Sequence, residues 1–355
     1  MDIIKLTPAV KDFIWGGRKL QGYGKVGDKI AETWELSFHE AGYSLTPDGR
    51  PLAIVATKKD LGLNVEGFDF FPMLIKLIDA EDNLSVQVHP SDEYSLKNEG
   101  QLGKTEMWYI VEAEEGAGIY LGFKRDVTPE ECAAAIENGT ALDLLNFVKV
   151  KAGEHYFIKS GTVHAIGKGC TICEIQQNSN VTYRVYDYGR KDANGNGRPL
   201  HIEKAKAVAC LKGASPLSPV CKMDGFTVIG VSKYFTVYAK DVCGGAYWNV
   251  DIGSFCAISV VSGNGTVDGT EVKTGDTLFV PAGYGSIELD GKMKLLLSTV
   301  RTYTAERSGD ILIVKDDLGR EVASACGNKD TRALADIALA PLGADNNDLK
   351  TIREV

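Results

Sequence analysis

The sequence predicts a mainly β protein built from two related β-barrel modules, and three observations support this fold class. Short runs of β-branched and aromatic residues recur along the 355-residue chain, separated by Gly, Asn and Asp, which is typical of a sandwich or barrel. Two segments repeat one pattern of lysine, glycine and phenylalanine. One stretch, residues 128–148, carries helix signals instead.

The strand candidates are closely spaced along the chain. The first module contains the runs 72–80, 84–90, 107–113, 118–123, 171–177 and 181–188. The second contains the runs 226–231, 255–261 and 276–283. Strands this close together, with turn residues between them, argue against alternating βαβ units.

A small helical insertion is expected at residues 128–148. Thr128 and Glu131 have the spacing of a capping box, and Pro129 suits the first helical position. Gly139 would end the helix. The insertion therefore interrupts the strands without changing the fold class.

The internal repeat indicates a duplicated β-module. KAGEHYFIKSGTVHAIG aligns without gaps on KTGDTLFVPAGYGSIEL, in these pairs: Lys151 with Lys273, Gly153 with Gly275, Phe157 with Phe279, and Gly161 with Gly283. Two glycines that frame a strand at matched spacing suggest tight turns at both ends. Because His164 falls on Ser286, any chemistry of His164 would be confined to the first module.

Charge and composition exclude several classes of protein. A formal net charge of −9 argues against a general surface for nucleic acid or anionic membrane. No window approaches the roughly 20 apolar residues of a membrane span, and the N-terminus lacks the apolar core of a signal peptide. Eight cysteines scattered over a long chain favour reduced thiols. We therefore expect a soluble cytoplasmic protein.

The strand in LSVQVHPSDE carries polar residues at alternate positions. Side chains two residues apart point the same way in a strand, so Ser85, Gln87 and His89 share a face. A half-exposed surface strand would explain this pattern equally well.

A second strand adds donors of the same kind. In GKTEMWYIV the same alternation places Lys104, Glu106 and Trp108 on one face. With His164 and the pair on the first strand, the candidates are two imidazoles, one carboxylate and one amide, without a thiolate. Such a set suits a divalent ion such as Zn²⁺ acting as a Lewis acid.

Two cations stand in apolar or aromatic runs. Lys76 in FFPMLIKLIDA either reaches the surface with its ammonium or is buried with a lowered pKa, which would suit proton transfer. Arg184, in NSNVTYRVYDYGR with Asp187, is either stacked for structure or placed to clamp an anion.

Taken together, these motifs resemble the type I mannose-6-phosphate isomerases (phosphomannose isomerases) of the cupin superfamily, in their shorter bacterial form. The similarity runs through FIWGGRKL, AETWELS, FPMLIKLIDAEDNLSVQVHPSDEYS, LGKTEMWYIV, GTVHAIGKGCTICEIQQNSNVTYRVYDYGR and RPLHIEKA, over residues 1–205. It implies two cupin-type double-stranded β-helix (jelly-roll) barrels. It also implies a zinc enzyme that interconverts mannose 6-phosphate and fructose 6-phosphate through a cis-enediol, which connects mannose with glycolysis and GDP-mannose synthesis.

The family pattern assigns roles to individual residues. It places the ligands of one zinc ion at Gln87, His89, Glu106 and His164. It places catalytic residues at Arg184, Lys104 and Lys76. It places weaker candidates for contacts to the substrate phosphate at Ser91 and Lys97. Which lysine acts as the base is left open, and a lysine that is desolvated beside cations is expected to have a lowered pKa.

The resemblance also implies a division of the chain. We expect an N-terminal catalytic cupin domain at 1–215, a C-terminal cupin-like domain without a metal site at 216–305, and a tail at 306–355 that has no assigned role. The expected partner is a hexose 6-phosphate, and the chain is expected to be a monomer or a homodimer.

Two alternatives remain. A non-enzymatic sugar-phosphate sensor could keep the pocket, but it would have little reason to keep Arg184 and Lys104 beside a full ligand set. A metal-dependent cupin of other chemistry, such as a dioxygenase or an epimerase acting on another sugar, would more often replace Gln87 with a third histidine.

Overall fold

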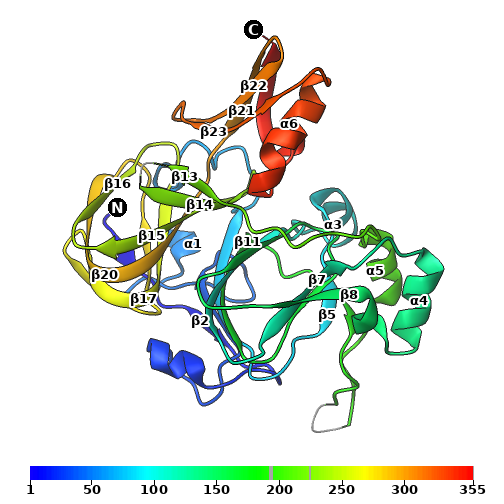
Figure 1. The fold of residues 1–355 in the computed structure, drawn as a ribbon. Coiled ribbons are helices and arrows are strands. Elements are labelled where there is room, and N and C mark those ends of the chain that lie inside the picture. Colours follow the sequence, from blue (N-terminus) through cyan, green and yellow to red (C-terminus); the bar gives the residue numbers. More distant parts are fainter. Residues whose placement is uncertain (192–194, 224, 355) are drawn as a thin grey trace. The chain divides into compact units, whose positions relative to one another are not determined.

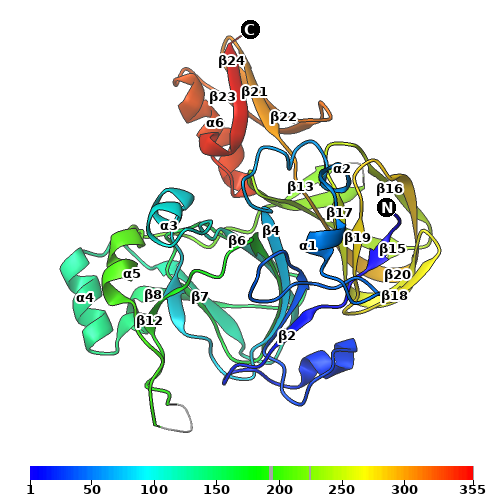
Figure 2. The same ribbon diagram turned by 180° about the vertical axis from the view of Figure 1, so that it is seen from behind.

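The computed structural model describes residues 1–355 except 192–194, 224 and 355, and strands dominate its regular structure (Figures 1 and 2). The mainly β fold is thus confirmed. The chain forms two compact units, which we describe separately. The site unit comprises residues 10–34 and 74–217, and the second-barrel unit comprises residues 1–9, 35–73 and 218–355. No helix in the described residues is long and apolar enough to span a membrane.

Two sheets form the site unit. One contains β5 (Val86–Val88), β7 (Gly118–Phe123), β8 (Leu145–Lys149), β10 (His164–Ile166) and β12 (Tyr183–Tyr186). Its order is β12-β5-β10-β7-β8. The other contains β2 (Ala9–Lys11), β3 (Glu32–Leu36), β4 (Met73–Asp79), β6 (Glu106–Ala113), β9 (His155–Ile158) and β11 (Cys170–Gln177). Its order is β2-β3-β4-β11-β6-β9.

Strands β4 and β11 are buried along their whole length. Apolar side chains at their odd-numbered positions, such as Ile75 and Ile175, are fully buried on one face. Their polar side chains Lys76 and Glu174 line a cavity instead. Because side chains alternate in a strand, one strand can serve both the core and the cavity.

Helix α4 (Pro129–Glu137) confirms the helical part of the insertion. The hydroxyl of Thr128 accepts a hydrogen bond from the backbone N–H of Glu131 at 3.1 Å, as an N-cap residue does. The second half of the insertion is not a continuous helix. After the 3-10 turn Ala141–Leu144 the chain enters β8, because β7 provides a partner for strand pairing there.

Two further helices complete the site unit, α3 (Asp92–Asn98) and α5 (Ile202–Val208). Figures 1 and 2 show α4 and α5 side by side. Both pack against the five-stranded sheet, since Ile136 of α4 and Ala205 of α5 belong to one apolar cluster with Val86 and Val88. The face of β5 that carries the two valines is therefore the covered one.

The second-barrel unit is built on a nine-stranded sheet. Its strands are β1 (Ile4–Lys5), β13 (Cys221–Met223), β14 (Phe226–Val231), β15 (Thr236–Cys243), β16 (Ala246–Val250), β17 (Cys256–Val267), β18 (Thr270–Lys273), β19 (Thr277–Val280) and β20 (Gly285–Thr299). The order is β1-β19-β17-β20-β15-β14-β13, with β16 on β20 and β18 on β17. Two short helices, α1 (Leu52–Val55) and α2 (Lys58–Leu61), belong to the same unit.

The internal repeat corresponds to matching structure. Strand β9 of the site unit and β19 of the second-barrel unit occupy aligned positions in the two segments. Gly153 and Gly275, which precede these strands, have φ of 92° and 93°, in a region that side-chain-bearing residues rarely adopt. His164 is buried, whereas its counterpart Ser286 is exposed. The duplicated turns are therefore kept, while the histidine position differs.

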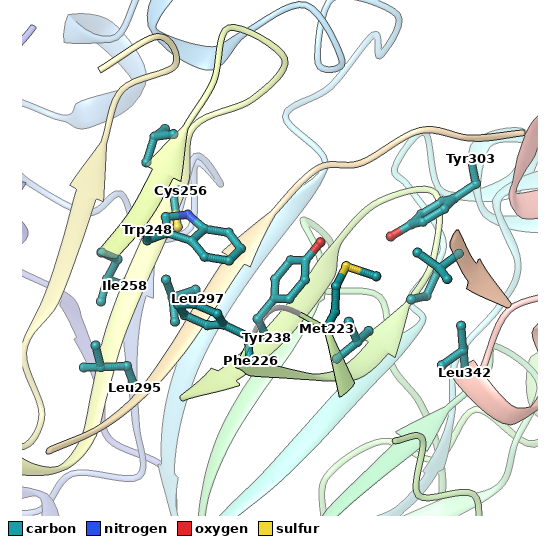
Figure 3. Packing of buried hydrophobic residues seen from close by; sticks show 14 of the residues in the cluster. Met223, Phe226, Tyr238, Trp248, Cys256, Ile258, Leu295, Leu297, Tyr303 and Leu342 are labelled. Atoms are coloured by element: carbon teal, nitrogen blue, oxygen red, sulfur yellow. The ribbon is translucent and has the colours of Figure 1, made fainter. Parts of the chain in front are cut away.

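The C-terminal segment folds into a four-stranded sheet with one helix against it. The strands are β21 (Tyr303–Ser308), β22 (Ile311–Asp316), β23 (Glu321–Cys326) and β24 (Leu349–Glu354), in the order β23-β22-β21-β24, and the helix is α6 (Thr331–Leu339). Figure 3 shows Tyr303 and Leu342 of this segment in the apolar cluster that also contains Tyr238 and Trp248 of the barrel. The segment therefore belongs to the core of its unit.

We expect Leu312→Ala to destabilise the second-barrel unit by about 2–5 kcal/mol, because it leaves a cavity in a buried core. Leu312 is fully buried, whereas the neighbouring Ile311 is 52% exposed. Ile311→Ala is therefore the matched control, with an expected change within about 0.5 kcal/mol. Urea denaturation measures both changes, and equal midpoints for the two variants would contradict the burial of Leu312.

Candidate metal centre and active-site cavity

Strand pairing brings the expected metal ligands together. His164 of β10 lies opposite Gln87 of β5, and His89 follows directly after β5. Glu106 begins β6, which pairs with β11 in the other sheet. The ligand atoms of His89, Glu106 and His164 lie within 4.8 Å of one another, and all three residues are buried. The cluster of candidate metal ligands therefore contains residues from both sheets of the site unit.

Backbone contacts orient both imidazoles. Nδ1 of His89 lies 2.8 Å from the carbonyl oxygen of Val181, and Nδ1 of His164 lies 2.8 Å from that of Thr162. An Nδ1–H that donates to a carbonyl leaves the lone pair on Nε2 for a metal. The amide of Gln87 is 3.4 Å from Nε2 of His164, and a half-turn of this amide exchanges its nitrogen and oxygen. These donors fit Zn²⁺.

The protonation states also suit metal binding. Burial, reinforced by the charge of Lys104, lowers the pKa of His89 to about 3. Burial likewise lowers the pKa of His164. Burial would raise the pKa of Glu106, but the charge of Lys104, together with the contact to His89, outweighs it and holds this pKa well below the usual value. Neutral imidazoles and an ionised carboxylate are the forms that bind a metal.

Two lysines border the cluster, and their charges are already compensated. The ammonium of Lys104 contacts the carboxylate of Glu106 and lies 3.3 Å from Nε2 of His89. The ammonium of Lys76 lies 3.4 Å from Glu32 and 3.3 Å from Glu174.

The expected lowering of a lysine pKa is wrong for Lys76 in this structure. Burial alone would lower its pKa, but the charges of Glu32 and Glu174 outweigh burial and raise it. Lys76 is therefore held as a cation. The sequence pattern around Lys76 could not reveal this, because Glu32 lies on β3, far away along the chain.

Glu174 is a site residue that sequence reasoning missed. Its carboxylate accepts a hydrogen bond from Nε1 of Trp108 at 2.9 Å and lies between Lys76 and Lys104. Burial, together with the charge of Glu106, raises the pKa of Glu174 to about 7. Its only signal in the sequence was a carboxylate between two apolar residues in TICEIQQ. A buried carboxyl group that titrates near neutral pH is suited to proton transfer.

A cavity of about 280 Å³ opens beside this cluster. Its walls include Gln87, Lys104, Lys76, Glu174 and Arg184, so four of the expected site residues and the missed carboxylate face the same space. The pairing of Arg184 with Gln87 across β12 and β5 explains why this arginine lies beside an expected metal ligand. The alternating polar face of β5 is therefore the wall of a cavity rather than a solvent-exposed surface.

The two expected phosphate contacts lie elsewhere. Ser91 and Lys97 line a different groove, of about 490 Å³, together with Tyr94 and Ser160. Neither residue lines the cavity beside the metal cluster. Ser85, two residues before Gln87, does line that cavity. The alternation that places Ser85 on the polar face ends at the N-cap of α3, where Ser91 stands, so Ser91 is aimed at another surface.

Comparisons with known proteins agree with this geometry. The family model "Phosphomannose isomerase type I, catalytic domain" matches residues 3–116, and "Mannose-6-phosphate isomerase, cupin domain" matches residues 226–300. Neither match reaches the C-terminal four-stranded sheet. The mannose-6-phosphate isomerase of Streptococcus mutans is 38% identical over 300 residues, which cover 80% of this chain and 94% of that protein. ManA of Bacillus subtilis is 37% identical, covering 82% and 96%.

Solved structures show the same fold. The crystal structure of the Bacillus subtilis mannose 6-phosphate isomerase matches with a TM-score of 0.77 at 36% identity, covering 84% of this chain and 99% of that chain. A mannose 6-phosphate isomerase crystallised with zinc and yttrium matches with a TM-score of 0.69 at 17% identity, again covering 84% and 99%. The second likeness concerns the fold alone.

Proposed function

Because the chain belongs to the type I phosphomannose isomerase family, we propose that it interconverts mannose 6-phosphate and fructose 6-phosphate in the cavity beside Gln87. One observation supports placing the reaction in the cavity beside Gln87. One cavity is lined by a carboxyl group with a pKa of about 7, by two lysine ammonium groups and by Gln87, whose amide adjoins His164 of the ligand cluster. An aldose–ketose isomerisation needs a proton carrier and stabilisation of an oxyanion, and this cavity offers both.

Glu174 is the proton carrier in this proposal. Its carboxylate takes the proton from C2 of the open-chain aldose, the C–H electron pair forms the C1–C2 double bond, and the aldehyde oxygen takes up negative charge. The hydroxyl proton on O2 then passes to O1, the O2 electron pair forms the C2 carbonyl, and the electron pair of the double bond takes the proton back from the carboxyl group at C1. A pKa of about 7 lets one group perform both transfers near neutral pH.

The remaining residues stabilise the charge that develops on the oxygens. Zinc, held by Gln87, His89, Glu106 and His164, supplies a Lewis acid when bound. The guanidinium of Arg184 and the ammonium groups of Lys76 and Lys104 face the cavity as fixed positive charges. Preorganised cations in a site that excludes water stabilise an enediolate more than they would in bulk water.

The alternatives are less well supported. A sensor would not need a carboxyl group tuned to neutral pH between two lysines. A redox cupin would more often use iron with open coordination positions, and Zn²⁺ has no redox states. The amide of Gln87 in place of a third imidazole favours the zinc isomerase.

We place the reaction in the cytoplasm. All eight cysteines are free thiols, four of them buried, which fits a reducing compartment. The expected partner is the sugar phosphate itself. The choice between monomer and homodimer stays open.

The test is turnover of a panel of hexose phosphates by the zinc-loaded chain, followed by NMR in D₂O. We expect mannose 6-phosphate to yield fructose 6-phosphate, with deuterium at C1 wherever the carboxyl group exchanges its proton with solvent. Binding without turnover would favour the sensor. Oxygen consumption would favour an oxygenase. Turnover of another hexose phosphate, without turnover of mannose 6-phosphate, would show that mannose 6-phosphate is not the substrate.

A further inference from the structure

Three arginines gather around one buried carboxylate at the edge of the cavity. Asp187 is 6% exposed and accepts hydrogen bonds from Arg190 at 2.6 Å and from two nitrogens of Arg198 at 2.8 and 2.5 Å. Arg184 lies close enough for the charge of Arg198 to lower its pKa further, after burial. The exposed Asp82 approaches only Arg190, at 3.5 Å. The cluster therefore carries excess positive charge in a chain whose net charge is −9.

Only two of these arginines reach the cavity. Arg184 and Arg198 line it, whereas Arg190 donates to the backbone oxygen of Asn83 at 2.5 Å. Nε of Arg184 is buried and lacks a hydrogen-bond acceptor among the described residues. Burying a charged donor without an acceptor is costly, so Arg184 is suited to an oxygen of the substrate that supplies one.

Three hydrogen bonds connect residues 199–201, which follow Arg198, to Arg184. The backbone N–H of Arg184 donates to Nδ1 of His201 at 3.1 Å, and the backbone N–H of His201 donates to the oxygen of Arg184 at 2.8 Å. Nη1 of Arg184 donates to the oxygen of Pro199 at 2.8 Å. These bonds fix the backbone next to Arg198 beside β12, while Asp187 fixes the Arg198 guanidinium.

The other cations of the cavity are occupied. Lys76 lies against Glu32 and Glu174, and Lys104 lies against Glu106. Asp187 takes the Nε and one Nη of Arg198, which leaves the N–H groups of the other Nη without an acceptor in the described part of the chain. A guanidinium can bind a carboxylate and a phosphate at the same time because it has five N–H donors in a planar fork.

We propose that Arg198, oriented by Asp187, binds the phosphate group of the sugar phosphate and so determines the preference of the cavity for phosphorylated substrates. The inference rests on the proposed function, since it takes the cavity as the substrate site. Arg184, paired with Gln87, faces the reacting carbons, and Arg198 holds the other end of the substrate.

The test compares single variants of the zinc-loaded chain. Arg198→Ala is expected to raise KM for mannose 6-phosphate by about 10- to 100-fold, as expected for a lost charged hydrogen bond, with kcat within about 3-fold. The inhibition constant of inorganic phosphate should rise in parallel. Arg198→Lys should give an intermediate KM, because an ammonium keeps the charge but not the fork. Arg184→Ala should instead lower kcat.

Arg125→Ala is the matched control, since it removes an arginine paired with a carboxylate (Glu131) in the same unit, outside the cavity. An unchanged KM and phosphate inhibition constant in Arg198→Ala would overturn the inference, as would a loss confined to kcat. A rise in KM for Lys97→Ala alone would move the phosphate to the other groove and also overturn it. If the parent chain turns over no mannose 6-phosphate, the proposed function fails, and calorimetric binding of inorganic phosphate to the parent and Arg198→Ala chains still decides the role of Arg198.

Discussion

Removal of the metal from the purified chain is expected to abolish isomerisation of mannose 6-phosphate, and equimolar Zn²⁺ is expected to restore it. His89, Glu106 and His164 bring two neutral imidazoles and one ionised carboxylate together in a buried place. Without the divalent charge, the developing oxyanion loses its strongest stabilisation, which is worth several kcal/mol and hence at least about 1,000-fold in kcat. A coupled assay after EDTA treatment and dialysis measures the loss.

A variant of Glu106 tests whether zinc binds at the ligand cluster or adventitiously elsewhere on the chain. Glu106→Gln keeps the side-chain size but removes the negative charge, so we expect loss of zinc by mass spectrometry together with loss of activity. Glu112→Gln is the control, because Glu112 is an exposed carboxylate on the same strand and lies outside the cluster. Full activity in a chain verified to be free of metal would refute the role of zinc, and zinc retention by Glu106→Gln would refute Glu106 as a ligand.

The ligand cluster could be predicted from the sequence because its signals are local. Alternation along one strand places Gln87 and His89 on the same face, and the same rule places Lys104 with Glu106. The structure adds the strand pairing that joins these faces, which the sequence pattern alone does not determine. The resemblance to the type I phosphomannose isomerases is what implies that these residues form one ligand set.

What the sequence could not reveal depends on contacts between distant strands. The sign of the Lys76 pKa shift depends on Glu32 of β3 and Glu174 of β11, which are far apart along the chain but flank β4 in one sheet. Arg198 gains its role through Asp187, and no spacing rule links the two. Ser91 does not line the cavity, because the chain turns into α3 just after the motif in which the alternation holds.

The C-terminal segment illustrates a different limit. Its strands and helix pack into the core of the second-barrel unit, so Leu312 and Leu334 are buried with barrel residues such as Tyr238. The internal repeat does not predict that the C-terminal segment packs into this core. The matched family models do not predict it either, because they end at residue 300. The sequence therefore predicts residues 306–355 only as a tail without an assigned role, although the segment forms part of the core of the unit.

Glu174→Gln is expected to lower kcat by about 10²–10⁴-fold while zinc stays bound, since the variant loses the proposed proton carrier but none of the four proposed ligands. The pH dependence gives a sharper test than the rate alone. Burial and the charge of Glu106 raise the pKa of Glu174 to about 7, so the fraction of the basic form falls as the pH drops through this value. The kcat/KM of the parent chain should therefore decline on the acid side with an apparent pKa at or below about 7, because a bound divalent cation favours the carboxylate.

The residual activity of Glu174→Gln should lack this acid limb, and Glu174→Asp, which keeps a carboxyl group but shortens its reach, should retain the limb at a reduced rate. A purely structural role would predict the opposite pattern, a uniform loss in both variants with the shape of the profile unchanged. Retention of the acid limb in Glu174→Gln would assign the titration to another group and would leave Glu174 as a partner that positions Lys76 and Lys104.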